Sequence, residues 1–151
     1  MLKGVNDNLD TLVQLYDKLR AMDIEAHYMF HCVPRAGISH LRTSIEEDLE
    51  LIKELTMSGK ISGRCKPKYT LMTDIGKITL YEGIILDKKE DMILLQTKYS
   101  KNERLEWNPS WKIPDSAMVD QNGHLRVWYR DGKIHNEGWP STYYFNANNN
   151  K

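Results

Sequence analysis

The sequence predicts an α/β fold in which helices and parallel strands are followed by a small antiparallel β unit. Two observations support this prediction. In residues 1–80, helical and strand patterns alternate with short connectors, which is typical of parallel sheets. In residues 81–151, short β-like runs are separated by turn-forming dipeptides. We therefore expect two parts, residues 1–80 and 81–151, in this chain of 151 residues.

Residues 9–22 are expected to form the first helix. Apolar side chains recur there at spacings of three and four, which gives one apolar stripe. Asp7 or Asn8 can cap the start of this helix. Residues 24–32, IEAHYMFHC, have a strand pattern. The run Tyr28–Phe30 is so continuously apolar that we expect a strand buried on both faces.

A second helix is expected at residues 44–57. Ser44 and Glu47 match the S-x-x-E capping box, in which each side chain binds a free backbone N–H at the helix start. Residues 68–72 have the next strand pattern, and we expect them to pair in parallel with residues 26–31. The predicted buried face of the helix consists of Ile45, Leu49, Ile52 and Leu55.

The second half is expected to be an antiparallel sheet. Strand patterns occur at residues 77–86, 91–99 and 124–134. Asn122-Gly123 and Asp131-Gly132 are tight-turn dipeptides, because both positions tolerate positive φ. Four tryptophans lie in this half, and although aromatic side chains can line a ligand groove, we expect them to form the core of the β unit. They are Trp107, Trp111, Trp128 and Trp139.

Composition excludes several classes of function. The chain has 21 Lys and Arg and 21 Asp and Glu, so its formal net charge is zero. A neutral balance predicts no nucleic-acid partner and no membrane partner, and no apolar run approaches the ~20 residues that span a bilayer. Cys32 and Cys65 are not in a metal-site spacing, so we predict no metal site, free thiols and a cytoplasmic protein.

Lys77 is the candidate for chemistry. It lies in the run LMTDIGKITLY, residues 71–81, where apolar residues flank it on both sides. The plain interpretation is a surface charge, because lysines in strands usually point into solvent. The alternative is a lysine amine in a partly desolvated site, which loses its proton more readily and becomes nucleophilic. The preceding Gly76 would let the backbone come close to a cofactor.

Three motifs occur in the first part of the chain: LKGVND at residues 2–7, MFHC at 29–32 and GISHLRT at 37–43. In order and spacing they resemble the lysine 2,3-aminomutase family, whose members are radical S-adenosylmethionine enzymes that also use pyridoxal phosphate. The likeness extends over about residues 1–80. The resemblance implies that this part is the C-terminal portion of a TIM-like β/α barrel and that residues 81–151 are a small antiparallel appendage. It also aligns Met1 inside a family strand, so that LKGV would end a strand.

The resemblance implies a function as well. Family members move an amino group between C2 and C3 of an amino acid through an imine with pyridoxal phosphate, and the cofactor supplies the difficult chemistry. Lys77 falls where the family has the lysine that forms the Schiff base with pyridoxal phosphate. Asp74 and Val33 are candidates for the pocket of the small-molecule amino-acid substrate. Because Val33 stands where lysine-specific members have an aspartate, an amino acid without a distal ammonium is as good a substrate candidate as lysine.

One family motif is absent. The 151 residues contain no C-x-x-x-C-x-x-C, the motif that supplies three thiolates to the family's [4Fe–4S] cluster. The ligands of this cluster and of S-adenosylmethionine are therefore not expected in this chain. We expect a C-terminal piece that is inactive alone and has the N-terminal part of the barrel as a partner. The alternatives are a non-enzymatic remnant and a small α/β module that binds a partner.

Overall fold

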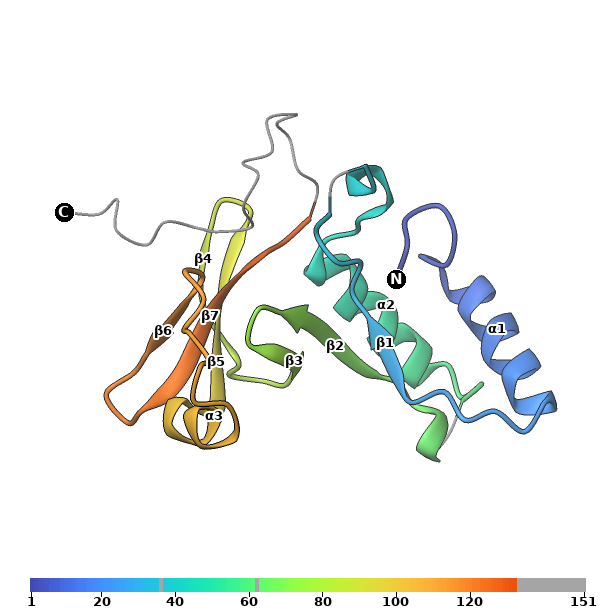
Figure 1. Ribbon diagram of the computed structural model, residues 1–151. Helices are drawn as coiled ribbons and strands as arrows, with labels where there is room; N and C mark the ends of the chain where they lie inside the picture. The colour runs from blue at the N-terminus through green and yellow to red at the C-terminus, as the bar shows by residue number, and fades with distance from the viewer. Residues whose placement is uncertain (36, 62, 133–151) are drawn as a thin grey trace. The chain divides into compact units, whose positions relative to one another are not determined.

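The computed structural model describes residues 1–35, 37–61 and 63–132 (Figure 1). The chain forms two compact units. The N-terminal unit contains residues 1–72 and Gly132, and the C-terminal unit contains residues 73–131. Residues 73–80, which we assigned to the first part from the sequence, therefore lie in the C-terminal unit. Within the described residues, no helix is long and apolar enough to cross a membrane.

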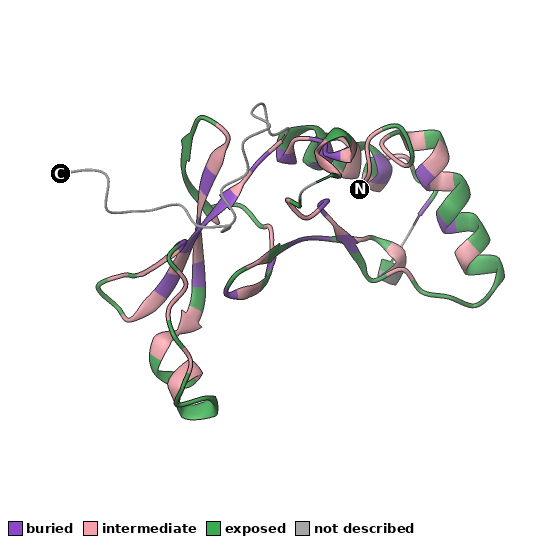
Figure 2. Ribbon diagram, turned by 45° about the horizontal axis from the view of Figure 1, so that its top comes forward, coloured by how far each residue is buried: buried purple, intermediate pink, exposed green. Residues whose placement is uncertain are grey.

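The first helix, α1, extends from Leu9 to Ala21. The Asn8 side chain caps it, because Asn8 Oδ1 accepts a hydrogen bond from the Thr11 backbone N–H at 2.9 Å. Both the helix and this cap confirm the sequence prediction. Helix α1 is mostly exposed (Figure 2), and its buried residues are Leu12 and Tyr16.

The N-terminal segment differs from its prediction. Residues 2–5 form a turn and not the end of a strand. The backbone N–H groups of Val5 and Asn6 both donate to the Leu2 carbonyl at 3.1 Å, and Gly4 has a φ of +71°. Such a conformation suits glycine and interrupts an extended chain.

The parallel pairing predicted for the first half is confirmed. Strand β1 (Tyr28–Phe30) pairs in parallel with strand β2 (Lys68–Thr73), and Met29 lies opposite Tyr69. The strand β1 is shorter than the predicted range of residues 24–32. It is also not buried on both faces, because Met29 is 7% exposed whereas Tyr28 is 39% exposed.

Helix α2 (Ile45–Met57) connects these two strands and begins with the predicted capping box. The Ser44 N–H donates to Glu47 Oε2 at 2.7 Å, and the Glu47 N–H donates to Ser44 Oγ at 3.1 Å. One member of the predicted buried face is wrong: Leu49 is 38% exposed, whereas Asp48 is 1% exposed. Asp48 faces the strands, where its carboxylate contacts His31 and Tyr69.

The core of the N-terminal unit lies on the Met29 side of the strands. Because its members come from both helices and from β1, α1 and α2 cover the same face of the sheet. Burial raises the pKa of Tyr16 in this core to about 12, with a smaller contribution from Cys65. The buried members of the core are Met1, Leu12, Tyr16, Met29, Leu55 and Ile61.

The C-terminal unit contains a four-stranded sheet whose pairings are antiparallel, as predicted. Its strands are β4 (Ile85–Lys89), β5 (Met92–Ser100), β6 (Ala117–Val119) and β7 (His124–Arg130), in the order β4-β5-β7-β6. The short strand β3 (Gly76–Thr79) precedes them in the chain. Strand β6 was not predicted, and the pattern at residues 77–86 is divided between β3 and β4. The core residues Ile93, Leu95, Leu125 and Val127 come from the two central strands.

Helix α3 (Lys101–Trp107) was not predicted. Ser100 caps it by accepting hydrogen bonds from the N–H groups of Asn102 and Glu103, at 3.2 and 3.4 Å. The tryptophan core is only partly confirmed: Trp128 is 7% exposed, but Trp107 at the end of α3 is 88% exposed. Trp111 is half-buried, and Trp139 lies outside the described residues.

Candidate functional site

Lys77 and Asp74 lie together in one short segment of the C-terminal unit. Lys77 is the second residue of β3, and its side chain is exposed. Asp74 and Ile75 connect β2 to β3. Within this segment, Thr73 Oγ1 donates to the Gly76 carbonyl at 2.7 Å. We call residues 73–77, which comprise the turn of residues 74–75 and the adjoining ends of β2 and β3, the Lys77 turn.

Side chains from elsewhere in the C-terminal unit bind the backbone of the Lys77 turn. Arg104 Nη2, from α3, donates to the Ile75 carbonyl at 2.6 Å. The Tyr99 hydroxyl, from β5, donates to the Lys77 carbonyl. The guanidinium carbon of Arg104 lies 4.8 Å from the centroid of the Tyr99 ring, within the range of a cation–π contact. The turn is therefore held by two residues that are distant from it in the sequence.

Gly76 is required for the geometry of this turn. Its φ of +114° lies in a region that side chains rarely adopt. A Cβ at this position would also lie 3.3 Å from Arg104 Nη2. The glycine before Lys77 thus serves both the backbone conformation and the close approach of the guanidinium.

Asp74 is exposed, but one of its oxygen atoms is bound. The hydroxyl of Ser116, which is 2% exposed, donates to Asp74 Oδ2 at 2.6 Å. The third candidate, Val33, lies in the N-terminal unit, in the loop after β1, and is half-buried. That Lys77 and the loop of residues 33–37 share one concave face stays a prediction.

Of the three groups that the resemblance implies, pyridoxal phosphate and the [4Fe–4S] cluster can be compared with the described residues. An exposed lysine on a defined turn fits covalent attachment of pyridoxal phosphate. An iron–sulfur cluster does not fit, because the sequence has only two cysteines, of which Cys32 is buried and Cys65 is half-buried. In the part of the chain that the structure describes, no group of three or more His, Cys, Asp or Glu residues is placed to hold a metal ion.

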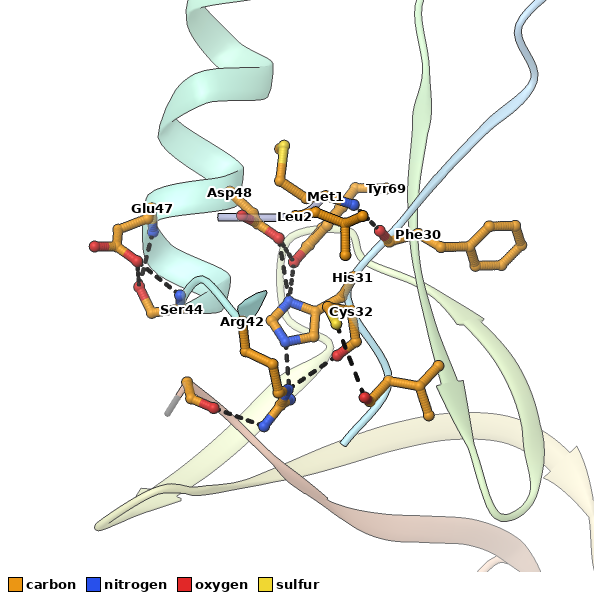
Figure 3. Close-up of polar contacts among 12 residues, drawn as sticks. Met1, Leu2, Phe30, His31, Cys32, Arg42, Ser44, Glu47, Asp48 and Tyr69 are labelled. Atoms are coloured by element: carbon orange, nitrogen blue, oxygen red, sulfur yellow. Dashed lines mark hydrogen bonds and ion pairs between the residues drawn. The ribbon is translucent and has the colours of Figure 1, made fainter. Parts of the chain in front are cut away.

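A second cluster of functional groups is buried in the N-terminal unit (Figure 3). It contains His31 directly after β1, Arg42 in the loop before α2, Asp48 in α2 and Tyr69 in β2. These four residues are between 0% and 3% exposed. We call them the buried polar cluster.

The contacts of the cluster define the protonation of His31. Arg42 Nη2 lies 2.9 Å from His31 Nε2, and because a guanidinium only donates, Nε2 accepts. The proton of a neutral ring is therefore on Nδ1, which faces Asp48 Oδ2 at 3.1 Å and the Tyr69 hydroxyl at 2.7 Å. Tyr69 in turn donates to Asp48 Oδ2 at 2.6 Å.

Arg42 extends the cluster to the backbone. Its Nε donates to the Cys32 carbonyl at 3.0 Å and its Nη1 to the Gly132 carbonyl at 2.6 Å. The cluster thus fixes the end of β1, the GISHLRT segment and α2 with respect to one another. The cluster lies on the helix-covered side of the strands, and its four side chains are buried in the N-terminal unit.

None of the four residues was a candidate in our interpretation of the sequence, and Asp48 was left out of the predicted buried face of α2 although it is 1% exposed. The predicted buried face contained residues 45, 49, 52 and 55. A set with residue 48 in place of residue 49 fits the helical spacing of three and four equally well. An acidic residue at such a position is the signal that would have indicated a buried polar contact.

Comparison with known proteins identifies relatives of one kind, although no family model matches. A putative L-lysine 2,3-aminomutase from Aquifex aeolicus is 35% identical over 91 residues, which is 59% of this chain and 24% of that protein. The L-lysine 2,3-aminomutase of Clostridium subterminale is 28% identical over 100 residues, 64% of this chain and 23% of that protein. The glutamate 2,3-aminomutase of Clostridioides difficile is 26% identical over 115 residues, 75% of this chain and 27% of that protein.

These relatives are amino-acid 2,3-aminomutases. The match confirms the resemblance in the sequence motifs: over the matched residues, the chain is related to the lysine 2,3-aminomutase family. The chain spans about a quarter of the length of the curated relatives it matches.

Proposed function

We propose that this chain is the C-terminal portion of an amino-acid 2,3-aminomutase and that Lys77 is the residue that attaches pyridoxal phosphate. The observation that supports this role is the geometry of the Lys77 turn. An exposed amine follows a glycine with positive φ, and both neighbouring backbone carbonyls are bound by side chains. An exposed lysine in a strand is also what the interpretation as a surface charge expects, and the bound carbonyls are the feature that distinguishes this lysine.

We further propose that the N-terminal unit is part of a TIM-like barrel. The order α1-β1-α2-β2, with parallel strands and both helices on one face, is the repeat from which such barrels are built. The opposite face carries Tyr28 and Phe30, which are less buried than Met29. In a barrel, this face would meet further strands, which we assign to a polypeptide that contains the N-terminal part of the barrel.

Pyridoxal phosphate, when bound, supplies the carbon–nitrogen chemistry of the amino-group migration. The residues of this chain have simpler tasks. Lys77 holds the cofactor through its amine, and Asp74, held by Ser116, offers a negative charge three residues away. We assign the ligands of the [4Fe–4S] cluster and of S-adenosylmethionine to the partner polypeptide and derive no step through them.

The substrate is an amino acid, and either lysine or an amino acid without a distal ammonium satisfies the proposal. Val33 is apolar and half-buried, so this position offers no charge to a distal ammonium. Of the three candidates, Lys77, Asp74 and Val33, only Asp74 carries a negative charge that a distal ammonium could contact. Because the relatives include both lysine and glutamate 2,3-aminomutases by name, we retain both lysine and an amino acid without a distal ammonium as substrate candidates.

Labelling with pyridoxal phosphate tests the assignment of Lys77. The purified chain is incubated with the cofactor, reduced with borohydride, digested and mapped by mass spectrometry. We expect the pyridoxyl adduct at Lys77 to exceed that at Lys98, an exposed lysine of the same unit. The variant Lys77→Arg should lose the Schiff-base absorbance, whereas Lys98→Arg should keep it. Equal labelling of both lysines would show that Lys77 is an ordinary surface residue.

One observation favours a second candidate function, a module that binds a partner protein. Trp107 is 88% exposed, and tryptophan is enriched at protein interfaces. The same labelling experiment separates the two functions, because a module of this kind has no reason to prefer Lys77 as the site of modification.

A further inference from the structure

Two backbone carbonyls on either side of Gly76 are bound by side chains from outside the turn. Arg104 binds the carbonyl of Ile75, and Tyr99 binds the carbonyl of Lys77 itself. The turn is only five residues long, so these two contacts leave little freedom for the peptide groups that lead into and out of Gly76.

Arg104 and Tyr99 act together and not as two separate contacts. The guanidinium lies over the Tyr99 ring, at 4.8 Å from its centroid. Because the guanidinium is planar and has several donors, it can stack on a ring and donate a hydrogen bond at the same time. We call Arg104 and Tyr99 the turn clamp.

The turn clamp also explains why a glycine precedes Lys77. A Cβ at residue 76 would lie 3.3 Å from Arg104 Nη2 and 3.8 Å from Tyr99 Cε2. The clamp therefore occupies the side of the turn that a side chain would fill. Gly83, by comparison, also has positive φ but has open space around it.

We infer that Arg104 and Tyr99 are positioning residues for the Lys77 amine. By fixing the backbone on both sides of Gly76, they define the direction in which the Lys77 side chain leaves the turn. A reactive group that is already oriented loses less conformational freedom when it attaches to a cofactor. This inference rests on the proposed function of Lys77, and it assigns a role in that function to one residue of β5 and one of α3.

The test compares clamp variants with a matched control. Tyr99→Phe removes one hydroxyl, Arg104→Gln removes the guanidinium, and Arg126→Gln changes a half-buried arginine whose contacts are with Gln96 and Asp120. We expect the ratio of Lys77 to Lys98 adducts to fall about tenfold in the clamp variants, as for the loss of a hydrogen bond worth roughly one factor of ten. The control should keep the wild-type ratio.

A second measurement does not depend on the cofactor. Hydrogen–deuterium exchange of the amides of residues 73–79 should accelerate in Tyr99→Phe and Arg104→Gln but not in Arg126→Gln. A residue with only a structural role would lower the thermal midpoint without changing the adduct ratio. Tyr99→Phe stays informative even where Arg104→Gln unfolds, because it keeps the aromatic ring in place.

The outcomes separate the two proposals. If the wild type shows no preference for Lys77, the proposed function fails, and the exchange measurement alone decides whether the clamp holds the turn. If the wild type prefers Lys77 and both clamp variants keep that preference, the positioning role is overturned while the proposed function stands. Loss of the preference together with faster exchange supports both.

Discussion

Arg42 is fully buried, and each of its three guanidinium nitrogens has a partner. Nε and Nη1 donate to carbonyls, and Nη2 donates to His31. A buried charge is costly unless it is paired and hydrogen-bonded. Here the Arg42 guanidinium and the Asp48 carboxylate contact opposite nitrogens of the His31 ring, so the imidazole lies between two charges that compensate each other.

Replacing Arg42 should therefore destabilise the fold more than an average substitution. We expect Arg42→Ala to lower the free energy of unfolding by about 3–5 kcal/mol, because it leaves the Asp48 carboxylate without its balancing charge. Urea unfolding followed by circular dichroism measures this change. The matched control is Arg35→Ala at an exposed position, where a change within about 0.5 kcal/mol is expected. Equal effects at both positions would contradict the role of the cluster.

At the residue scale, the sequence pointed to Lys77 and Gly76 as candidates but not to the side chains that contact the backbone around them. Lysine after glycine in an apolar run is a local signal, so it is visible in the sequence. The contacts from Tyr99 and Arg104 are made across 22 and 29 residues, and no spacing rule indicates them. The same holds for Asp48, whose partners His31 and Tyr69 become neighbours only when β1 and β2 pair.

At the scale of elements, local chemistry determined which predictions succeeded. Helix α2 was found from the motif of Ser44 and Glu47, and the cap forms as expected. Helix α3 was missed although Ser100 and Glu103 have the same spacing and Ser100 caps it. The neighbouring β-like runs led us to treat this segment as a break. The burial of strand β1 was overestimated, because burial on both faces was inferred from the apolar composition of residues 28–30 alone.

The capping box of α2 predicts a dependence of stability on pH. The Ser44 N–H, through its hydrogen bond, is the largest influence on the pKa of Glu47 and holds it below the ordinary value of 4.5. A carboxyl whose pKa is lowered by folding stabilises the native state above pH 4.5, and this contribution is lost as the pH falls through the lowered pKa.

We therefore expect Glu47→Gln to remove part of the acid sensitivity of the chain. Its free energy of unfolding should be lower than that of the wild type near pH 6 and approach the wild-type value near pH 3. The difference should be at most about 1 kcal/mol, because the carboxylate is exposed and screened. Urea unfolding at a series of pH values measures this. Glu54→Gln, at an exposed position of the same helix, should retain the wild-type dependence; an identical profile for both variants would argue against the capping role.

At the scale of the whole molecule, the fold class followed from the order of the elements. Parallel pairing in the first half and an antiparallel sheet in the second were both predicted from pattern alone. The unit boundary lies between Met72 and Thr73, earlier than the predicted residue 80. Strand β2 continues across this boundary. The local sequence therefore does not indicate that the residues on its two sides pack in different units.

The cysteine content leads to a prediction for the chain as a whole. Reconstituted with iron, sulfide and S-adenosylmethionine without oxygen, it should produce no 5′-deoxyadenosine above background, since its two cysteines cannot replace the three-thiolate motif. Chromatographic detection of the nucleoside measures this, with the Clostridium subterminale aminomutase as positive control. Turnover comparable to the control would contradict the assignment of the cluster to a partner.

The turn clamp has a consequence for which truncations and substitutions this chain should tolerate. A chain ending at residue 80 would retain Lys77, Gly76 and all three motifs shared with the aminomutases, yet both clamp residues would be gone. If the proposed role of Lys77 holds, residues beyond position 80 supply the side chains that bind the backbone on both sides of Gly76. We expect substitutions at positions 99 and 104, and at Gly76 beside them, to be tolerated less well than substitutions at exposed positions of the appendage.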